Sequence, residues 1–390
     1  MSKLICPNCM AVHQAVKEGN CPHCKATGSQ VYQFQNSDDY LEREVPRVIQ
    51  ERKELGLNGL VGGLEAIIIN TERDRLRAAT EELLATTGYQ FSESFSHNGY
   101  QHCVLNYPGS ADILVSARLG NENPFREFNL NPKSEHRPNS RLETFVFRTE
   151  DLDSYVNIQQ GRGVRFLTET ILEWDNYRFI QTIPSSFTGV SIGLIQWKGG
   201  KRSYLSQGAT GLGWVPKKPE TNHLQNIGVL DHTASRVHAR DRDAAIIEFM
   251  ELTNYHFDFA IYVKSFNSIT NVARLSKGEF AMVFTSGITP FQDLEHSGPT
   301  EKFIHNYGTR THHLAFDTKN IEETYQGLKD SGMGFLLELV GSPEEGLKQT
   351  FSEASPNTLL VNEYIHRYGD FTGFFTRSNV TQLTESTEKQ

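Results

Sequence analysis

The sequence predicts an α+β protein made of four βαβββ units that pair into two open eight-stranded barrels, preceded by a short cysteine-rich segment. A pattern of one apolar strand, one amphipathic helix and several short strands occurs four times along the chain. The distance between equivalent strands is nearly constant. One such unit cannot enclose a cavity alone, whereas two units side by side close an open barrel.

The composition is that of an ordinary globular protein, with 37% hydrophobic and 22% charged residues among 390. Such a length allows two or three domains, at roughly 100–200 residues each. The net charge of -9 argues against nucleic acid as the main partner, because phosphate binding depends on clustered Lys and Arg. No apolar stretch approaches the length of about 20 residues that crosses a bilayer. The N-terminus lacks the features of a signal peptide, so we expect a cytoplasmic protein without membrane contact.

Four of the five cysteines lie within the first 24 residues, as two Cys-x-x-Cys pairs made of Cys6, Cys9, Cys21 and Cys24. Each pair forms a tight knuckle, and four thiolates give the tetrahedral sulfur shell that zinc prefers. The segment is too short to bury a core, so a bound metal would supply its folding energy. We therefore predict a structural zinc ribbon over 1–32. A rubredoxin-like iron site that passes electrons is the alternative.

The four units follow a polar stretch at 35–57, which is interpreted as a linker with helical character over 39–55. The opening strands are predicted at 64–68, 141–147, 229–233 and 311–316. The helices after them are predicted at 72–86, 151–160, 241–252 and 321–330. Equivalent positions of the opening strands are 78 residues apart in the first pair (Ala66 to Thr144) and 81 in the second (His232 to His313). This regular spacing indicates a duplication.

Polar residues in the third and fourth units sit where a metal site requires them. His232 and His313 occupy equivalent positions of two opening strands, so both imidazoles can point inward. Glu363 alternates with apolar residues on the last strand, and a buried carboxylate is costly unless a metal or a strong donor meets it. Two histidines and one carboxylate form a facial triad with open coordination positions. We predict a mononuclear site, with iron(II) and oxygen chemistry.

Each open barrel encloses a concave space, here called its cup. The other pair of units has Ala66 and Thr144 at the positions of the two histidines, so only one of the two cups is expected to keep a metal. The predicted organisation is a zinc ribbon at 1–32, a linker at 33–57, a metal-free domain at 58–205, an inter-domain loop at 206–221, a catalytic domain at 222–377 and a C-terminal tail at 378–390.

Three segments resemble the metal-binding segments of 4-hydroxyphenylpyruvate dioxygenase and its relative hydroxymandelate synthase, in the vicinal-oxygen-chelate superfamily. They are Leu-Asp-His at 230–232, His-His-Leu-Ala-Phe at 312–316 and Glu-Tyr-Ile-His-Arg at 363–367. Gly-Phe-Phe at 373–375 resembles the Gly-Asn-Phe that opens the C-terminal helix closing that family's active site. The C-terminal half matches in order and spacing, and the N-terminal half matches only in unit layout. The zinc ribbon is outside the family pattern.

The resemblance implies the vicinal-oxygen-chelate fold and His232, His313 and Glu363 as iron(II) ligands. It implies a 2-oxo acid substrate that reacts with O2 by oxidative decarboxylation and hydroxylation. It also suggests a homo-oligomer through the metal-free half. The phenylalanines Phe371, Phe374 and Phe375 are candidates for an aromatic wall and lid, or pack the terminal helix.

The chain departs from the family around the substrate. Segment 286–302 offers Thr289, Gln292 and Thr300 but no matching pair of Asn and Gln side chains, and the loop after Glu363 is shorter. His312 stands where the family has Gln, and either hydrogen-bonds a substrate or faces the other side of its strand. These changes favour a different 2-oxo acid or another chelating substrate.

Other functions stay open at this stage. Arg367 could anchor an acidic group of a substrate, or form a salt bridge. The same metal cup could serve extradiol ring cleavage or a glyoxalase-type isomerisation. A non-enzymatic protein that binds a small ligand, with a protein partner on its zinc ribbon, is a third class.

Overall fold

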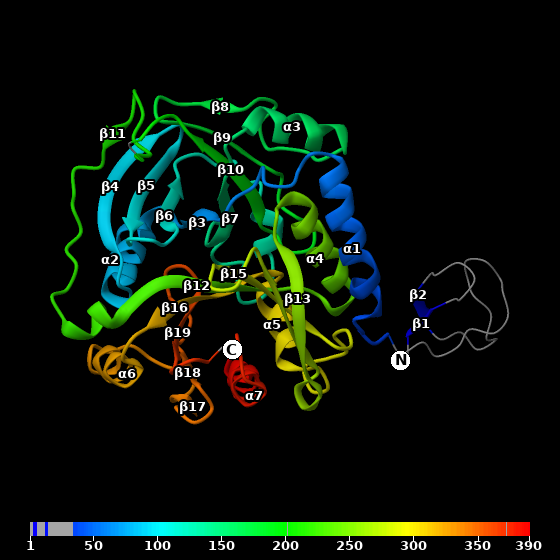
Figure 1. Cartoon of the computed structure of the whole chain (residues 1–390). Helices are drawn as coiled ribbons and strands as arrows, with labels where there is room; N and C mark the ends of the chain where they lie inside the picture. The colour runs from blue at the N-terminus through cyan, green and yellow to red at the C-terminus, as the bar shows by residue number, and fades with distance from the viewer. Residues whose placement is uncertain (1–2, 6–11, 15–33, 201, 372) are drawn as a thin grey trace.

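Two curled sheets form the body of the computed structural model, and helices lie around and between them (Figure 1). The structure describes residues 3–5, 12–14, 34–200, 202–371 and 373–390. Strands β1 (Lys3–Ile5) and β2 (Val12–Gln14) pair antiparallel. The four N-terminal cysteines lie outside the described residues, so the zinc ribbon stays a prediction.

The N-terminal sheet has nine strands in the order β11-β4-β5-β6-β3-β7-β10-β9-β8. Their bounds are β3 Leu64–Thr71, β4 Gln90–His97, β5 Tyr100–Asn106, β6 Asp112–Arg118, β7 Arg141–Arg148, β8 Leu172–Glu173, β9 Tyr177–Gln181, β10 Ser191–Trp197 and β11 Thr210–Gly211. Eight of these strands come from the two predicted units. The ninth, β11, comes from the segment expected to be an inter-domain loop, and it extends the sheet beside β4.

The C-terminal sheet has eight strands in the order β13-β14-β15-β12-β16-β19-β18-β17. Their bounds are β12 Ile227–Arg236, β13 His256–Val263, β14 Ser268–Arg274, β15 Ala281–Gly287, β16 Arg310–Thr318, β17 Val340–Ser342, β18 Leu347–Phe351 and β19 Val361–Arg367. The opening strands of the paired units, β12 and β16, lie side by side at the centre, as β3 and β7 do in the other sheet.

The register of the strands confirms the duplication. His232 on β12 pairs with Ala315 on β16, and Ala66 on β3 pairs with Val146 on β7. Two residues before these partners lie His313 and Thr144, which are therefore equivalent. The predicted alignment of the two halves holds at both histidine positions.

Four helices match the predicted ones: α2 Leu76–Thr86, α3 Leu152–Gly161, α4 Arg242–Leu252 and α6 Ile321–Asp330. Helix α5 (Pro299–Tyr307), which begins at a proline, was not placed from the sequence. Helix α7 (Arg377–Ser386) is the C-terminal helix that the resemblance implies after 373–375, although the sequence-based domain bounds left 378–390 as a tail; its N-cap Thr376 accepts a hydrogen bond from the Asn379 backbone. Most of the segment expected to be a tail is thus helix. Short 3-10 helices cover Arg73–Arg75, Arg126–Asn129, Asn222–Asn226, Ala239–Asp241, Lys264–Phe266 and Thr387–Lys389.

Helix α1 (Asp39–Glu54) confirms the helical character expected before the first unit, but it does more than connect. It packs on α4, and its residues Leu41 and Val48 are buried. The Arg52 guanidinium donates hydrogen bonds to three backbone carbonyls at the C-terminal end of α4 and just beyond it, those of Met250, Thr253 and Tyr255. The helix is therefore an integral part of the C-terminal half.

The main hydrophobic core contains residues of both halves, because alternate residues of each opening strand point away from the cups. Ile67 and Ile69 of β3 join this shared core together with Leu314 and Phe316 of β16. Ala66 belongs instead to a separate cluster inside the N-terminal cup. The two cups therefore open on the faces of the sheets that point away from the shared core.

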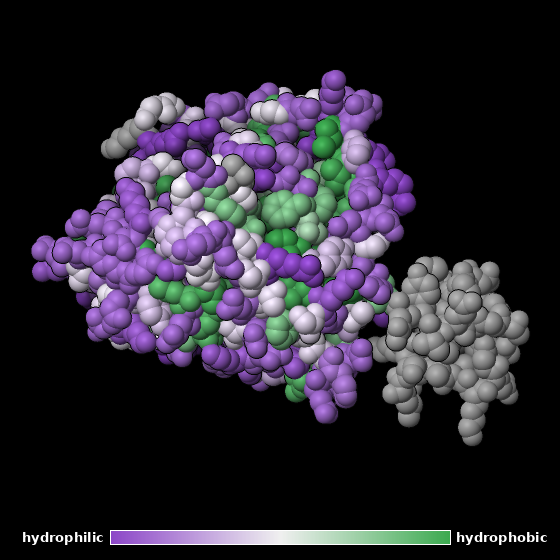
Figure 2. Space-filling model, turned by 60° about the horizontal axis from the view of Figure 1, so that its bottom comes forward, coloured by the Kyte–Doolittle hydropathy of each residue, from purple (hydrophilic) through white to green (hydrophobic). Residues whose placement is uncertain are grey.

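Hydrophilic residues dominate the face viewed in Figure 2, and hydrophobic residues show between them in smaller groups. Scattered exposed hydrophobic residues are normal on a folded protein. Among the described residues, none of the helices is both long and apolar enough to cross a membrane.

The contact between the halves depends on a glycine. A Cβ atom at Gly88 would lie 1.9 Å from the Ile227 carbonyl oxygen, where β12 begins. We expect Gly88→Ala to lower the free energy of unfolding by about 1–3 kcal/mol, because backbone must move to relieve the contact. Thermal unfolding measures this. Gly120→Ala is the control, since a Cβ there meets nothing within 4 Å, and equal losses in both variants would contradict the interpretation.

Candidate metal centre

Three buried side chains from neighbouring strands converge in the C-terminal cup. His232 comes from β12, His313 from β16 and Glu363 from β19. The Glu363 Oε2 atom lies 3.2 Å from the Nε2 atom of each histidine. One ligand atom of each residue lies within 4.8 Å of the others, which suits a single ion bound by all three. The sequence prediction that these residues meet is borne out by this geometry.

The strand order explains the convergence. Strands β12, β16 and β19 are consecutive in the sheet, and side chains on one face of a strand recur every second residue. Glu363 pairs with Ala315, the residue that also pairs with His232. The carboxylate and the imidazole therefore project from the same level of the cup.

Asp231 fixes the orientation of the first ligand. Its carboxylate accepts a hydrogen bond of 2.7 Å from Nδ1 of His232, which leaves Nε2 facing the other ligands. Burial opposes ionisation of Asp231, but the hydrogen bond from His232 and the charge of Arg367 outweigh burial and lower the pKa of this carboxyl. Burial likewise disfavours a charged His232, yet Glu363 and Asp231 raise its pKa to about 9. Such a carboxylate-histidine pair is the usual support of a metal ligand.

Arg367 belongs to this support. It donates two hydrogen bonds to Asp231, of 2.6 and 3.0 Å, and is largely buried. It does not line the pocket beside the triad. The structure therefore places Arg367 in the salt bridge that the sequence left as an alternative to substrate anchoring.

A chain of hydrogen bonds fixes the second imidazole. His313 Nδ1 lies 2.8 Å from Nδ1 of His312, whose Nε2 lies 2.8 Å from Oε1 of Gln390. Because an amide oxygen only accepts, His312 donates from Nε2 and accepts at Nδ1. His313 then carries its proton on Nδ1 and keeps Nε2 free for a metal. Burial and the neighbouring His312 hold the pKa of His313 well below its usual range, so this ligand is neutral.

The third ligand is held from helix α7. The Gln349 amide donates a hydrogen bond of 2.5 Å to Oε1 of Glu363 and accepts one of 3.0 Å from Asn379. Glu363 therefore presents Oε2 to the histidines while its other oxygen is occupied. Asn379 lies on α7, so the position of this helix is linked to a metal ligand.

Aromatic rings shield the triad from water. The ring centres of Phe374 and Phe375 lie 5.4 and 5.1 Å from that of His232, and Phe351 lies 4.8 Å from His313. Of the three phenylalanines singled out from the sequence, only Phe375 lines the pocket. Phe371 packs instead against Gly346, where a Cβ would lie 2.5 Å from its ring.

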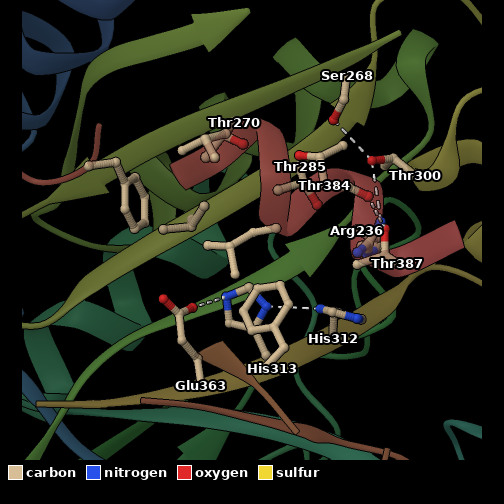
Figure 3. Close-up of a pocket in the computed structure, with 15 residues that line it drawn as sticks. Arg236, Ser268, Thr270, Thr285, Thr300, His312, His313, Glu363, Thr384 and Thr387 are labelled. Carbon is tan, nitrogen blue, oxygen red and sulfur yellow. Dashed lines mark hydrogen bonds and ion pairs between the residues drawn. The ribbon is translucent and has the colours of Figure 1, made fainter. Parts of the chain in front are cut away.

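The pocket beside the triad is small in this state, about 40 Å³. Its lining includes hydroxyl groups from β14, β15, α5, α7 and the 3-10 helix after α7, as Figure 3 shows: Ser268, Thr270, Thr285, Thr300, Thr384 and Thr387. Of the three residues proposed from segment 286–302, Thr300 lines this pocket, whereas Thr289 bonds to Asn267. His312 also lines it. Helix α7 covers the cup.

Arg236 is the one guanidinium among the described residues lining this pocket. It is 5% exposed, and none of the described carboxylates forms an ion pair with it. It donates a hydrogen bond of 3.3 Å to Thr300, stacks over the Phe303 ring at 4.7 Å, and its Nε has no partner among the described residues. Burial lowers its pKa to about 9, so it stays protonated at neutral pH. Figure 3 shows it beside Thr300 and Thr387, away from Glu363.

The sequence analysis did not single out Arg236, although a signal was present. It lies four residues after His232 on the same strand, and strand alternation therefore puts both on one face. Gln349 and Asn379 gave no comparable signal, because their roles depend on how β18 and α7 pack.

The N-terminal cup cannot bind an ion in the same way. Ala66 and Thr144 replace the histidines, and Gly193 takes the place of Glu363, since it pairs with Val146 as Glu363 pairs with Ala315. A Cβ at Gly193 would lie 3.0 Å from the Phe179 ring, so the space of the carboxylate is filled.

Solved structures with a similar fold support the predicted architecture. A triple mutant of 4-hydroxymandelate synthase from Streptomyces coelicolor matches 84% of this chain and 98% of its own, with 17% identity and a TM-score of 0.62. A fusion protein of a xylose isomerase-like TIM barrel with 4-hydroxyphenylpyruvate dioxygenase matches 93% of this chain and 60% of its own, with 13% identity and a TM-score of 0.56. No protein-family model and no curated protein matches the sequence.

The fold is therefore of the vicinal-oxygen-chelate type. The buried triad is consistent with a divalent metal. Two imidazoles and one carboxylate on one side of an ion leave coordination positions open for other ligands. The donor set and its support through Asp231, His312 and Gln349 fit such an ion.

Removal of one ligand tests this centre. We expect His313→Ala to lose the predicted iron and to spare the zinc of the predicted ribbon, because the two remaining ligands would bind a metal weakly. Elemental analysis after anaerobic iron loading should give one iron and one zinc per chain for the unmodified protein. Thr144→Ala, at the equivalent position of the other cup, is the matched control. Full iron content in His313→Ala would contradict the assignment.

Proposed function

We propose that the chain is a non-heme iron(II)-dependent dioxygenase that acts on a 2-oxo acid by oxidative decarboxylation and hydroxylation. The observation that carries this is the convergence of His232, His313 and Glu363 on one buried point. The similarity of fold to 4-hydroxymandelate synthase supports it.

The reaction balances without a further reductant. The 2-oxo acid loses its carboxyl group as carbon dioxide, its keto carbon becomes a new carboxylate with one oxygen atom of O2, and the other atom enters as a hydroxyl. Bound iron(II) supplies the Lewis acidity that chelates a 2-oxo acid and the electrons that activate O2. The three ligands leave positions open for both.

Arg236 defines the substrate class within this proposal. A buried guanidinium without a counter-charge is costly, and a substrate anion would compensate it. His232 and Arg236 are four residues apart on one strand, roughly 13 Å between their Cα atoms. With a divalent ion present, the ion, Arg236 and Arg367 together carry more positive charge than the carboxylates of Asp231 and Glu363 carry negative charge. We therefore propose a 2-oxo acid with a second anionic group at its far end, held by Arg236 and the nearby hydroxyl groups.

Helix α7 must move for this substrate to enter. A pocket of about 40 Å³ holds only a few water molecules, far less than a 2-oxo diacid needs. The side chains that close it from α7 include Val380 and Leu383, whose apolar surface excludes water once the helix is back. Exclusion of water strengthens the electrostatic interactions of the bound acid.

Anaerobic reconstitution with iron(II), followed by a panel of 2-oxo acids, tests the function. A visible charge-transfer band needs a bidentate chelate on the iron, so we expect it with the substrate class and not with simple carboxylic acids. On exposure to air, O2 uptake should equal carbon dioxide release. O2 uptake without carbon dioxide would indicate ring cleavage, and turnover without O2 would indicate an isomerase; either result would contradict the proposal.

The role of Arg236 gives a separate prediction. We expect Arg236→Met to raise KM for a 2-oxo diacid roughly 30-fold or more, since loss of one partner of a buried charge pair costs about 2–5 kcal/mol. Steady-state O2 uptake measures this. Arg236→Lys, which keeps the charge, should lose less, and iron content should be unchanged in both. An equal loss with a 2-oxo monoacid would show that Arg236 does not recognise the second anion.

A further inference from the structure

The metal-free cup encloses the larger cavity of the two. Its volume is about 820 Å³, against about 40 Å³ beside the metal triad. Pockets that bind small molecules typically measure about 300–1,000 Å³. The cavity is bounded by the concave face of the N-terminal sheet, with Ala66 and Thr144 at the positions of the two histidines. The cup without the three metal-ligating side chains is thus the more open one.

Aromatic side chains form much of its wall. The Trp174 ring lies 4.8 Å from that of Tyr177 and 6.2 Å from that of Phe179. Phe95 and Tyr204 add further aromatic surface. Flat faces of this kind suit a planar aromatic ligand, which stacks on them or meets their edges.

The other end of the cup is polar, and its two buried charges cancel; Glu122, the remaining acidic residue of the lining, is exposed. Arg118 and Glu143 form a bidentate ion pair of 2.7 and 2.5 Å, and both side chains are buried. The Arg118 guanidinium also lies 5.6 Å from the ring centres of Tyr100 and Phe125. Because Glu143 already neutralises Arg118, a second carboxylate would be repelled there. This distinguishes the cup from the metal pocket, where Arg236 has no counter-charge.

Two buried polar atoms at this end have no partner among the described residues: the Nε–H donor of Arg118 and the Oδ1 acceptor of Asn70. Asn70 is fully buried, and its Nδ2 donates to the Asn139 carbonyl at 2.9 Å, which leaves Oδ1 free. Because neither atom has appreciable accessible surface, both lie within the wall of the cavity and are not presented to a ligand inside it.

The strand register relates this end to the substrate end of the metal cup. Asn70 pairs with Ser116 on the neighbouring parallel strand, just as Arg236 pairs with Thr285. Both cups therefore keep their polar groups at the same place in the fold, with an amide in one and a guanidinium in the other.

We propose that the metal-free cup is a second binding site, for an uncharged planar aromatic molecule. The ring lies among Trp174, Tyr177 and Phe179. A neutral aromatic amide is one such molecule.

Isothermal titration of the full-length, iron-loaded protein with 2-naphthamide tests the site. We expect one equivalent to bind, and 2-naphthoate, which has the same ring with a negative charge, to bind at least about tenfold more weakly because of Glu143. His313→Ala should bind 2-naphthamide with unchanged affinity, since that variant affects only the other cup. No binding of 2-naphthamide, or equal affinity for the naphthoate, would overturn the proposal.

Variants that fill the cavity locate the site. Ile68 and Leu114 line it and pair with each other across β3 and β6. We expect Ile68→Trp to weaken binding at least about tenfold, whereas Ile68→Val, the matched control, retains it. Leu114→Phe fills the same space from the neighbouring strand and decides the matter if Ile68→Trp does not fold. Unchanged affinity in a folded filled variant would place the ligand elsewhere and overturn the proposal.

Discussion

The carboxylate of Glu363, buried between two imidazoles, is the constraint on which the rest of the C-terminal cup depends. A buried carboxylate needs strong partners, and here it has His232 and His313 on one oxygen and the Gln349 amide on the other. Each imidazole is in turn oriented from behind, by Asp231 or by His312. Hydrogen bonds thus fix which nitrogen faces the centre before an ion arrives, and a metal that meets three oriented ligands loses less free energy in ordering them.

The duplicated fold gives the protein two cups of one architecture with different contents. The equivalent strands place His232 and Ala66, or His313 and Thr144, at the same positions. In one cup the polar residues form the candidate metal site, and helix α7 closes the space above it. In the other, Phe179 covers the glycine that replaces the third ligand, and the remaining volume stays open. A shared core between the sheets lets the two inner faces diverge, because residues lining a cup hardly touch that core.

The sequence predicted the repeating units and the triad because both follow from local periodicity. An apolar strand before an amphipathic helix is visible in a short window, and equivalent positions of two such strands align by counting. The contacts that the sequence did not predict depend on packing between segments far apart in the chain. Arg52 of α1 satisfies carbonyls some 200 residues away, and polar residues on a helix interpreted as a linker give no hint of such a partner. The alternation of side chains along the strand did not show whether Arg367 binds a substrate or forms a salt bridge, since a substrate and Asp231 both offer a carboxylate. The zinc ribbon lies outside the described residues and stays a prediction from its four cysteines.

Helix α7 links access to the cup with the state of the metal ligands. Asn379 donates to Gln349, which holds Glu363, and Gln390 accepts from His312, which holds His313. Displacement of α7 and of the residues after it to admit a substrate would remove Asn379 and Gln390 from these contacts at once. The Gln349 amide oxygen would lose the hydrogen bond from Asn379, and His312 would lose the acceptor that fixes its tautomer. Glu363 and His313 would therefore be less firmly oriented in the open state. Closure over a substrate would restore them, and the complete, dry arrangement around the ion would then exist only when the pocket is shut.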